Sequence, residues 1–309
     1  MDTVKPVGRF APTPSGRMHL GNVFSALMAW LSVRSQDGEM VLRMEDLDTL
    51  RTSREFAEIL RDDLSWLGLT YDRETQAQST RGPVYDAYFE QLQEMNLLYP
   101  CYCTRSQLHS VNAPHLSDGT YVYPGTCRNL TAEERAAFHR LPAWRVKVDD
   151  RLWQFTDLVQ GPYSLNLSTE CGDMVVRRAD GVYVYQLAVT VDDGEAGVTE
   201  VVRGMDLLSS APRQMYLQEL FGFPHPVYAH VPMLLAPDGR RLSKRDRDLD
   251  LGEIRKYRKP QELLGFLAAS CGLIAAYEPI SLPELTSIFS WSRISPENIY
   301  LNNSVWADI

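Results

Sequence analysis

The stretch V-G-R-F-A-P-T-P-S-G-R-M-H-L-G-N (residues 7–22) runs from a short apolar strand through a proline- and glycine-rich turn into a helix. Val7 to Phe10 is expected to form the strand and Asn22 to Ser35 the helix. A helix that begins directly after a strand points unpaired N–H groups and the positive end of its dipole at the turn. Phosphate is the usual ligand of such a turn, so the stretch indicates a phosphate site.

Strands and helices alternate along most of the chain. Further strands are predicted at residues 40–44, 182–191 and 198–203, and further helices at 53–67, 85–95, 214–221, 260–271 and 282–290. Strands separated by helices favour a parallel sheet with right-handed connections. Ligands of such sheets bind outside the carboxyl ends of the strands, where Arg9-Phe10 and Arg43-Met44-Glu45 are expected to lie.

Four sequence blocks carry a family resemblance. Met18-His19-Leu20-Gly21-Asn22 and R-R-L-S-K-R (residues 240–245) resemble the HIGH and KMSKS signatures of class I aminoacyl-tRNA synthetases. R-M-E-D-L-D (residues 43–48) and V-T-E-V-V-R-G-M-D-L (residues 198–207) resemble two further blocks of the glutamyl branch of that family. The resemblance covers about residues 8–259.

The resemblance implies activation of an amino acid by ATP with Mg²⁺. Negative charge accumulates on the phosphate oxygens in this reaction, so fixed donors and cations are needed rather than a nucleophile. His19 at the start of the helix can donate to a phosphate, and Lys244 can close over the leaving pyrophosphate. Gly21 and Ser243 complete the expected ATP site.

Recognition of glutamate needs two cations and one anion. Arg9 and Arg203 can bind carboxylates with a bidentate geometry that lysine lacks, and Glu45 can pair with the α-ammonium group. Ordinary ion pairs are the alternative for each. The resemblance also implies that Tyr185 lines the pocket, and Asp192-Asp193 are expected near the acceptor nucleotide. The expected glutamate-binding residues are Arg9, Phe10, Ala11, Pro12, Thr13, Glu45, Tyr185 and Arg203.

Three cysteines lie together in a turn-rich stretch, two in the sequence Cys-Tyr-Cys and the third after Y-V-Y-P-G-T. Three thiolates suit one structural Zn²⁺, which prefers four ligands in a closed shell. Ordinary reduced thiols are the alternative. The expected ligands are Cys101, Cys103, Cys127 and either Tyr123, to which the resemblance points, or a histidine, His109 or His115.

Composition and charge limit the remaining choices. The chain has 309 residues, a net charge of −9 and five cysteines, of which Cys171 and Cys271 are expected in the core. An odd number of cysteines does not indicate a disulfide framework, and neither a membrane span nor a signal peptide is recognisable. A cytoplasmic protein without a membrane partner is expected. The acidic balance argues against indiscriminate binding to nucleic acid, and no DNA partner is expected.

Basic residues nevertheless concentrate between residues 240 and 259, where nine Lys or Arg accompany four Asp or Glu. A solvated loop is one explanation. On an acidic protein such a strip can also orient a polyanion, and structured RNA would be such a partner. The nine residues are Arg240, Arg241, Lys244, Arg245, Arg247, Arg255, Lys256, Arg258 and Lys259.

The expected fold class is α/β, with a Rossmann-like parallel sheet, an inserted zinc-binding subdomain and a small C-terminal helical part. The expected segments are 1–100 and 176–250 for the two halves of the catalytic domain, 101–175 for the insertion, and 251–309 for the helical part.

The length after the KMSKS-like block points to one branch of the family. Only residues 246–309 follow Arg245, which leaves little room for the long anticodon-binding region of a glutamyl-tRNA synthetase. The chain therefore resembles the glutamyl-queuosine tRNA(Asp) synthetases, truncated paralogues that place glutamate on queuosine in the anticodon. This implies the tRNA(Asp) anticodon stem-loop, L-glutamate and ATP as partners. The alternatives are a minimal glutamyl-tRNA synthetase that charges the 3′ end, an enzyme with a small-molecule or protein acceptor, and a non-catalytic RNA-binding paralogue.

Overall fold

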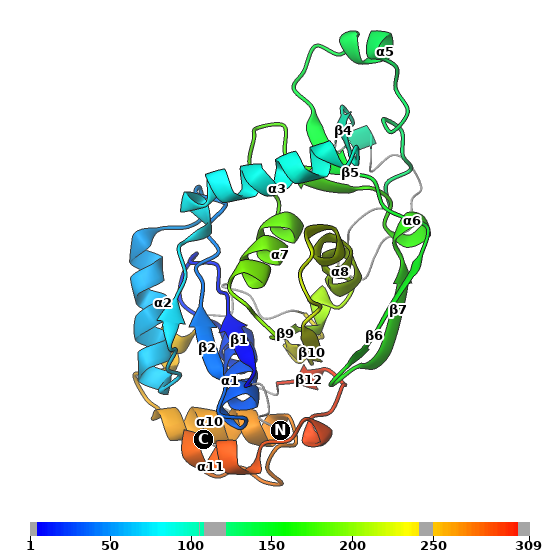
Figure 1. Cartoon of the computed structure of the whole chain (residues 1–309). Helices are drawn as coiled ribbons and strands as arrows, with labels where there is room; N and C mark the ends of the chain where they lie inside the picture. The colour runs from blue at the N-terminus through cyan, green and yellow to red at the C-terminus, as the bar shows by residue number, and fades with distance from the viewer. Residues whose placement is uncertain (1–4, 105, 108–121, 241–249, 302–309) are drawn as a thin grey trace.

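The centre of the protein is a five-stranded parallel sheet with the strand order β10-β9-β1-β2-β3 (Figure 1). The computed structural model describes residues 5–104, 106–107, 122–240 and 250–301. Because every pair in the sheet is parallel, the carboxyl ends of its strands lie at one edge. The strands are β1 (Val7–Phe10), β2 (Glu39–Leu42), β3 (Arg73–Glu74), β9 (Glu200–Gly204) and β10 (Val227–Val231).

Helices connect consecutive strands of this sheet. Helix α1 (Leu20–Arg34) follows β1, α2 (Arg54–Leu67) follows β2, and α8 (Ser210–Phe221) joins β9 to β10. Side chains cap the first two helices, since the backbone N–H of Phe56 donates to Ser53 and that of Asn22 donates to His19. Such caps satisfy N–H groups that a helix start leaves unpaired. Short 3₁₀ helices lie at Gln78–Thr80, Met205–Leu207 and Trp291–Arg293.

Two apolar cores lie on opposite faces of the sheet. Val202 and Ala229 belong to the core that contains α1 and α2, whereas the adjacent residues Val201 and Tyr228 belong to the other core. This alternation is the expected consequence of side chains pointing to opposite faces of a strand. The second core also contains residues of α3 (Gly82–Glu94), α7 (Tyr185–Glu195) and α8.

A region of short antiparallel strands and turns lies between α3 and α7, as the sequence predicts. One sheet has the order β4-β5-β8, and a separate hairpin is formed by β6 and β7. Helix α3 runs from beside the parallel sheet toward β4 and β5 (Figure 1). Where this region begins and ends as a domain stays a prediction. Its elements are β4 (Leu98–Cys101), α5 (Ala132–Ala136), β5 (Ala143–Val146), β6 (Leu152–Asp157), β7 (Gly161–Asn166), α6 (Leu167–Glu170) and β8 (Met174–Arg177).

The C-terminal elements pack onto the first core. Residues of α10 (Pro260–Ser270) and α11 (Leu282–Ile288) share the core with α1, and α9 (Leu251–Ile254) joins them. Strand β11 (Leu234–Leu235) pairs in parallel with β12 (Ile299–Tyr300). Among the described helices, none has both the length and the apolar character needed to cross a membrane.

The turn of the β6–β7 hairpin covers the outer edge of β10. The N–H of Leu158 donates to the carbonyl of Tyr228 (2.9 Å), and the side chain of Gln160 donates to the carbonyl of His230 (2.9 Å). The N–H of His230 in turn donates to the carboxylate of Asp157 (3.0 Å). The hairpin therefore supplies partners for backbone groups that an edge strand leaves unpaired.

One predicted element is wrong. Residues 182–191 are not a strand, because Tyr185–Glu195 forms helix α7. Its residues 187–193 are buried without interruption, so this helix has no polar face to reveal its period. A short run of buried apolar residues does not distinguish a strand from a helix. The other predicted strands and helices of the described residues exist, with ends that differ by a few residues.

Candidate active site

A cleft of about 630 Å³ opens at the carboxyl ends of β1, β2 and β9. It is lined by the whole glutamate-binding set that the sequence predicts, and by two residues of the predicted ATP site. Ser243 and Lys244, the other two predicted ATP-site residues, lie outside the described residues. The predicted residues in the lining are Arg9, Phe10, Ala11, Pro12, Thr13, His19, Gly21, Glu45, Tyr185 and Arg203.

Arg203 is a buried cation with one unused donor. Its Nε donates to Nε2 of His230 (2.9 Å), and its Nη1 donates to Oε1 of Gln214 (2.8 Å). Its Nη2 is buried and has no hydrogen-bond partner among the described residues. Buried donors are rarely left unpaired. An acceptor that binds in the cleft would therefore find a donor already in place.

A chain of amides fixes the orientation of Gln214. Its Nε2 donates to Oε1 of Gln186 (3.0 Å), and Nε2 of Gln186 donates to the hydroxyl of Ser210 (3.0 Å). Because the amide nitrogen of Gln214 is used in this way, its oxygen is turned toward Arg203.

Arg9 and Glu45 are joined by a second set of buried charges. Arg9 donates through Nε to Asp193 (3.4 Å) and through Nη1 to the carbonyl of Val202 (3.0 Å). Arg43 donates to both Asp193 (2.6 Å) and Glu45 (3.0 Å). Burial opposes ionisation of Asp193, but Arg43 and Arg9 together hold the pKa of its carboxyl below the ordinary value.

Burial changes the acid–base properties of two groups in the cleft. It raises the pKa of the Glu45 carboxyl, although Arg43 acts in the opposite direction. It also raises the pKa of the Tyr185 hydroxyl, so this group is a neutral hydrogen-bonding group at neutral pH. The cleft therefore combines three arginines, two carboxyl groups and one phenol, which belong to Arg9, Arg17, Arg203, Glu45, Asp206 and Tyr185.

The start of α1 forms another wall of the cleft. His19 is the N-cap residue, and its Nδ1 accepts from the backbone N–H of Asn22 (3.4 Å). A Cβ atom on Gly21 would lie only 3.0 Å from Cε1 of His19, so a side chain here would displace the imidazole. The sequence predicted both this helix start and its place in the cleft.

Asp250 and Leu251 lie against the first signature block. The N–H of Leu251, shortly after residues 241–249, donates to the carbonyl of Met18 (3.1 Å), and Asp250 forms a backbone bridge with His19. Asp63 of α2 accepts from the N–H of Met18 (3.3 Å). Sequence reasoning missed Asp63, since an acidic residue in an amphipathic helix gives no signal that it is buried.

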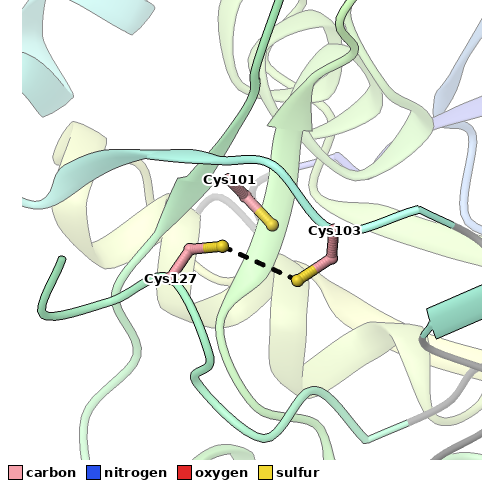
Figure 2. A group of neighbouring side chains, drawn as sticks. All are labelled: Cys101, Cys103 and Cys127. Atoms are coloured by element: carbon pink, nitrogen blue, oxygen red, sulfur yellow. Dashed lines mark hydrogen bonds between the residues drawn. The ribbon is translucent and has the colours of Figure 1, made fainter. Parts of the chain in front are cut away.

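The cysteine cluster consists of Cys101, Cys103, Tyr123 and Cys127 (Figure 2 shows its three thiols). The sulfurs of Cys103 and Cys127 are 3.6 Å apart, and the three Sγ atoms all lie within 4.8 Å of one another. The hydroxyl oxygen of Tyr123 is 3.5 Å from Sγ of Cys101 and 3.9 Å from Sγ of Cys103. The group could hold a metal ion. His109 and His115 lie outside the described residues.

Arg145 supplies positive charge to this cluster. Its Nε donates to Sγ of Cys101 (3.3 Å), and its guanidinium lies 3.6 Å from the centre of the Tyr123 ring. Burial opposes ionisation of Cys101, but Arg145 and the Tyr123 hydroxyl outweigh it and lower the pKa of this thiol. Cys171 and Cys271 are buried elsewhere, as predicted.

Comparison with known proteins identifies the family. The family described as tRNA synthetases class I (E and Q), catalytic domain, matches residues 5–297. The glutamyl-Q tRNA(Asp) synthetase of Symbiobacterium thermophilum is 44% identical over 306 residues, which cover 94% of each chain. That of Nitratidesulfovibrio vulgaris is 42% identical over 300 residues, or 93% of each chain. The chain belongs to the glutamyl-Q tRNA(Asp) synthetase family. It is therefore a ligase of the class I tRNA synthetase type.

Solved structures agree with the class I tRNA synthetase type. A glutamate-tRNA synthetase from Elizabethkingia anophelis superposes with a TM-score of 0.82 and 27% identity, over 97% of this chain and 69% of that chain. A glutamate tRNA ligase from Elizabethkingia meningosepticum, solved in complex with its amino acid, gives the same TM-score and identity. The predicted α/β fold with a parallel-sheet catalytic domain is thus confirmed.

Asp192 and Asp193 do not lie at an exposed strand end, and their expected place near the acceptor nucleotide stays a prediction. Both are buried in α7. Asp192 accepts from Gln78 (2.7 Å), Arg81 (2.7 Å) and the hydroxyl of Tyr85 (3.0 Å). Only the prediction that they follow a strand is wrong, because both residues belong to helix α7. In this protein they anchor the arginines beneath the cleft.

Among the described residues of the basic strip, Arg255 and Lys256 already have acidic partners. Arg255 donates to Asp62 (2.5 Å) and Asp63 (3.1 Å), so its charge is already paired in the fold. Lys256 is exposed and pairs with Glu253 (2.7 Å), and the neighbouring Tyr257 side chain is 79% exposed. Surface ion pairs of the second kind are weak and exchange readily.

A second, more open cleft of about 920 Å³ lies near the loop after β2. Several of the charged side chains there already have partners within the protein. Arg61 pairs with Glu58 (2.8 Å) and Glu74 (2.5 Å), and Asp46 accepts from Ser79 (2.6 Å). The smaller cleft, with the unused donor of Arg203, is therefore the better candidate for recognition of a charged substrate.

Proposed function

We propose that this ligase activates L-glutamate with ATP and transfers it to queuosine in the anticodon loop of tRNA(Asp). The observation that carries the first half is the buried, unused Nη2 of Arg203 in a cleft that also contains Arg9, Glu45 and Tyr185. A substrate with two carboxylates and one ammonium group matches this set of charges. A guanidinium can hold a carboxylate through two parallel hydrogen bonds, which a lysine cannot.

The adenylation step makes one bond and breaks one. An oxygen of the glutamate α-carboxylate attacks the α-phosphorus of ATP, and the bond to pyrophosphate breaks. In this proposal His19 and the N–H groups at the start of α1, which line the cleft, donate to phosphate oxygens. Gly21 keeps the approach to His19 clear of a side chain. In this proposal Lys244 and Ser243 stabilise the leaving pyrophosphate, and Mg²⁺ enters with ATP and neutralises phosphate charge.

The transfer step needs a hydroxyl acceptor. A hydroxyl of the queuosine cyclopentene diol attacks the carbonyl of the adenylate, AMP leaves, and an ester forms. The two glutamyl-Q tRNA(Asp) synthetases that match over almost their full length support this acceptor. Exposed Lys256 and Tyr257 offer contacts to phosphate and base. A tRNA partner also implies that the reaction takes place in the cytoplasm.

We further propose that Cys101, Cys103, Tyr123 and Cys127 hold one structural Zn²⁺. With Zn–S bonds of about 2.3 Å and a Zn–O bond of about 2.0 Å, a tetrahedral site has S···S separations of about 3.8 Å and S···O separations of about 3.5 Å. The separations in the cluster are 3.6 Å between Cys103 and Cys127, and 3.5 and 3.9 Å from Tyr123 to sulfur. Four protein ligands leave no open position, so the ion would stabilise the fold and take no part in adenylation.

Two assays test the function separately. Glutamate-dependent ATP–pyrophosphate exchange without RNA tests activation, and exchange with glutamate is expected before any tRNA is added. Transfer of labelled glutamate to tRNA(Asp) with and without queuosine tests the acceptor. Esterification of either hydroxyl removes the queuosine diol that periodate cleaves, so the queuosine of the product should resist periodate. Label at the terminal adenosine, or equal transfer to tRNA without queuosine, would instead establish a glutamyl-tRNA synthetase, which the likeness to the two Elizabethkingia structures favours.

A further inference from the structure

Arg203, His230 and Asp157 form a continuous hydrogen-bonded line that ends at the cleft. Nε of Arg203 is 2.9 Å from Nε2 of His230, and Nδ1 of His230 is 2.6 Å from Oδ2 of Asp157. The three side chains come from β9, β10 and β6, so the line joins the parallel sheet to the antiparallel hairpin. The His230 and Asp157 side chains are fully buried.

The chemistry of the two ends fixes the tautomer of His230. A guanidinium Nε–H can only donate, so Nε2 of His230 must accept and carries no proton. The ionised carboxylate of Asp157 can only accept, so Nδ1 of His230 must carry the proton. A doubly protonated His230 would direct an N–H at the N–H of Arg203. The line is therefore complete only with a neutral imidazole.

Asp157 is itself held from several directions. Besides His230, its carboxylate accepts from the backbone N–H groups of Val159 (3.0 Å) and Gln160 (2.9 Å) in the hairpin turn. Burial opposes ionisation of Asp157, but the hydrogen bonds from His230 and these N–H groups lower the pKa of the carboxyl. The carboxylate therefore stays charged and fixed at neutral pH.

We infer that His230 and Asp157 are positioning residues that hold the Arg203 guanidinium with Nη2 free to bind the substrate. Arg203 has three nitrogens, of which Gln214 uses one and His230 another. Without an acceptor for Nε, the guanidinium can reorient so that Nη2 donates to a neighbouring protein group. Nη2 is then no longer free to bind the substrate. The inference rests on the proposed binding of glutamate and adds two residues that do not themselves touch it.

The surroundings of His230 favour its neutral form. The charged groups that face it are the carboxylate of Asp157 and the guanidinium groups of Arg203 and Arg9. The ring of Tyr228 stacks on it at 5.9 Å between centroids. Burial, supported by the two arginines and opposed by Asp157, lowers the pKa of His230 to about 4.

Two substitutions at His230 separate its two contacts. The amide of asparagine reaches the place of Nδ1, so His230→Asn keeps a donor to Asp157 and loses the acceptor for Arg203. The amide of glutamine reaches the place of Nε2, so His230→Gln keeps an acceptor for Arg203. We expect His230→Asn to weaken glutamate binding roughly 10-fold or more, as loss of a buried charged hydrogen bond does. His230→Gln should remain within a few-fold of wild type, and ATP affinity should not change in either.

Binding of glutamate is measured by calorimetry, and the KM for glutamate and for ATP by pyrophosphate exchange. His225→Asn is the control, because His225 precedes β10 and its ring contacts the carbonyl of Met215 (3.2 Å) and the ring of Trp153. Melting temperatures of all variants show whether any loss of binding merely follows a loss of stability.

The imidazole ¹⁵N resonances provide a readout that does not depend on activity. His230 should carry its proton on Nδ1 and should not titrate between pH 8 and pH 5. In Asp157→Asn the amide can donate to Nδ1 of His230. The imidazole proton then moves to Nε2, where it faces the N–H of Arg203. That variant should show the other tautomer together with weaker glutamate binding.

Three results would decide against the inference. Equal glutamate affinity in wild type and His230→Asn would overturn it, and so would equal losses in His230→Asn and His230→Gln that track the melting temperature. A proton on Nε2 in the wild type would overturn it as well. A wild type that binds no glutamate at all would overturn the proposed function, and the inference with it.

Discussion

The cleft and the cysteine cluster both gather polar side chains from distant parts of the chain, but different forces hold them. The cleft lies at the ends of parallel strands between two large apolar cores, and ion pairs such as Arg43–Asp193 (2.6 Å) fix its arginines. Among the described residues, the core at the cysteine cluster consists of four buried residues, Tyr99, Cys101, Tyr123 and Cys127. The cleft is therefore organised by two large apolar cores, whereas the described residues around the cluster supply a much smaller one.

This difference has a general consequence for the two sites. A site on a well-packed sheet keeps its geometry before its ligand arrives, so binding costs little ordering of side chains. A site built from turns around a very small core takes much of its stability from the bound metal, and metal binding is then part of folding. Loss of a side chain in the cleft should accordingly lower substrate binding and leave the fold intact. Loss of the metal from the cysteine cluster should lower stability and leave glutamate activation intact.

The largest expected effect is at Arg203. Arg203→Ala should lower kcat/KM for glutamate in pyrophosphate exchange by roughly 10²- to 10³-fold, because a carboxylate of the bound glutamate would lose its buried guanidinium partner. Arg203→Lys should also be severely impaired, since lysine lacks the planar fork. The metal content of both variants should equal that of wild type. A loss of metal together with activity would mean that the two sites are not independent.

Removal of a thiolate should have the reverse pattern. Cys127→Ser should lose the single equivalent of zinc expected in wild type and melt at a lower temperature, while RNA-independent glutamate activation continues. Zinc is measured by elemental analysis of protein purified without chelator. Tyr123→Phe tests the fourth ligand alone, and undiminished zinc in that variant would rule out Tyr123 as the fourth ligand. Cys271→Ser serves as a control for loss of a buried thiol outside the cluster.

A smaller effect is expected from pH, which should change the free energy of unfolding through His230. Folding lowers the pKa of His230 from 6.5 to about 4. Between these values the unfolded chain binds a proton that the folded chain does not, so the free energy of unfolding falls as the pH decreases. This contribution is complete above about pH 6.5 and is lost progressively down to about pH 4.

Urea unfolding of wild type and His230→Gln at pH 7 and pH 5 isolates this contribution. Carboxyl groups whose pKa burial raises, such as Glu45 and Glu200, act with the opposite sign but are present in both proteins. The wild type should lose more stability on acidification than the variant. Equal losses would show that His230 is protonated in the folded protein.

The smallest effect is expected on the basic strip. Lys256→Glu should weaken tRNA(Asp) binding by a few-fold at low salt, with a smaller difference at high salt, because a phosphate contact is lost. Adenylate formation should not change. Arg255→Glu is the informative contrast, since it breaks the pairs with Asp62 and Asp63 and should lower the melting temperature. Filter binding across a salt series measures the first variant and thermal unfolding the second.

The sequence predicted those parts of the molecule that local patterns determine. The strand at 7–10, the helix start at His19 and the cleft residues Arg9, Glu45, Tyr185 and Arg203 all lie where the motifs indicate. The roles of the cleft residues and of the metal ligands stay predictions.

What the sequence could not supply is the support around these residues. His230 and Asp157 are 73 positions apart and belong to different sheets, so only the tertiary fold brings them together. Asp63 and Asp193 look like ordinary surface carboxylates in sequence, but each is buried and accepts from several donors. Helix α7 was missed because a helix buried on all sides has no periodic polar face.

The hairpin turn that hydrogen-bonds to His230 also covers one edge of the parallel sheet. Asp157, Leu158 and Gln160 occupy the outward-facing backbone groups of β10, and the opposite edge ends in the two-residue, charged strand Arg73–Glu74. Neither edge offers a row of free backbone groups on which another chain could add a strand. Damage to the turn would therefore do more than misorient an arginine. It would expose the edge of β10, on which a strand of another molecule could pair. Variants at Asp157 should therefore self-associate at high protein concentration.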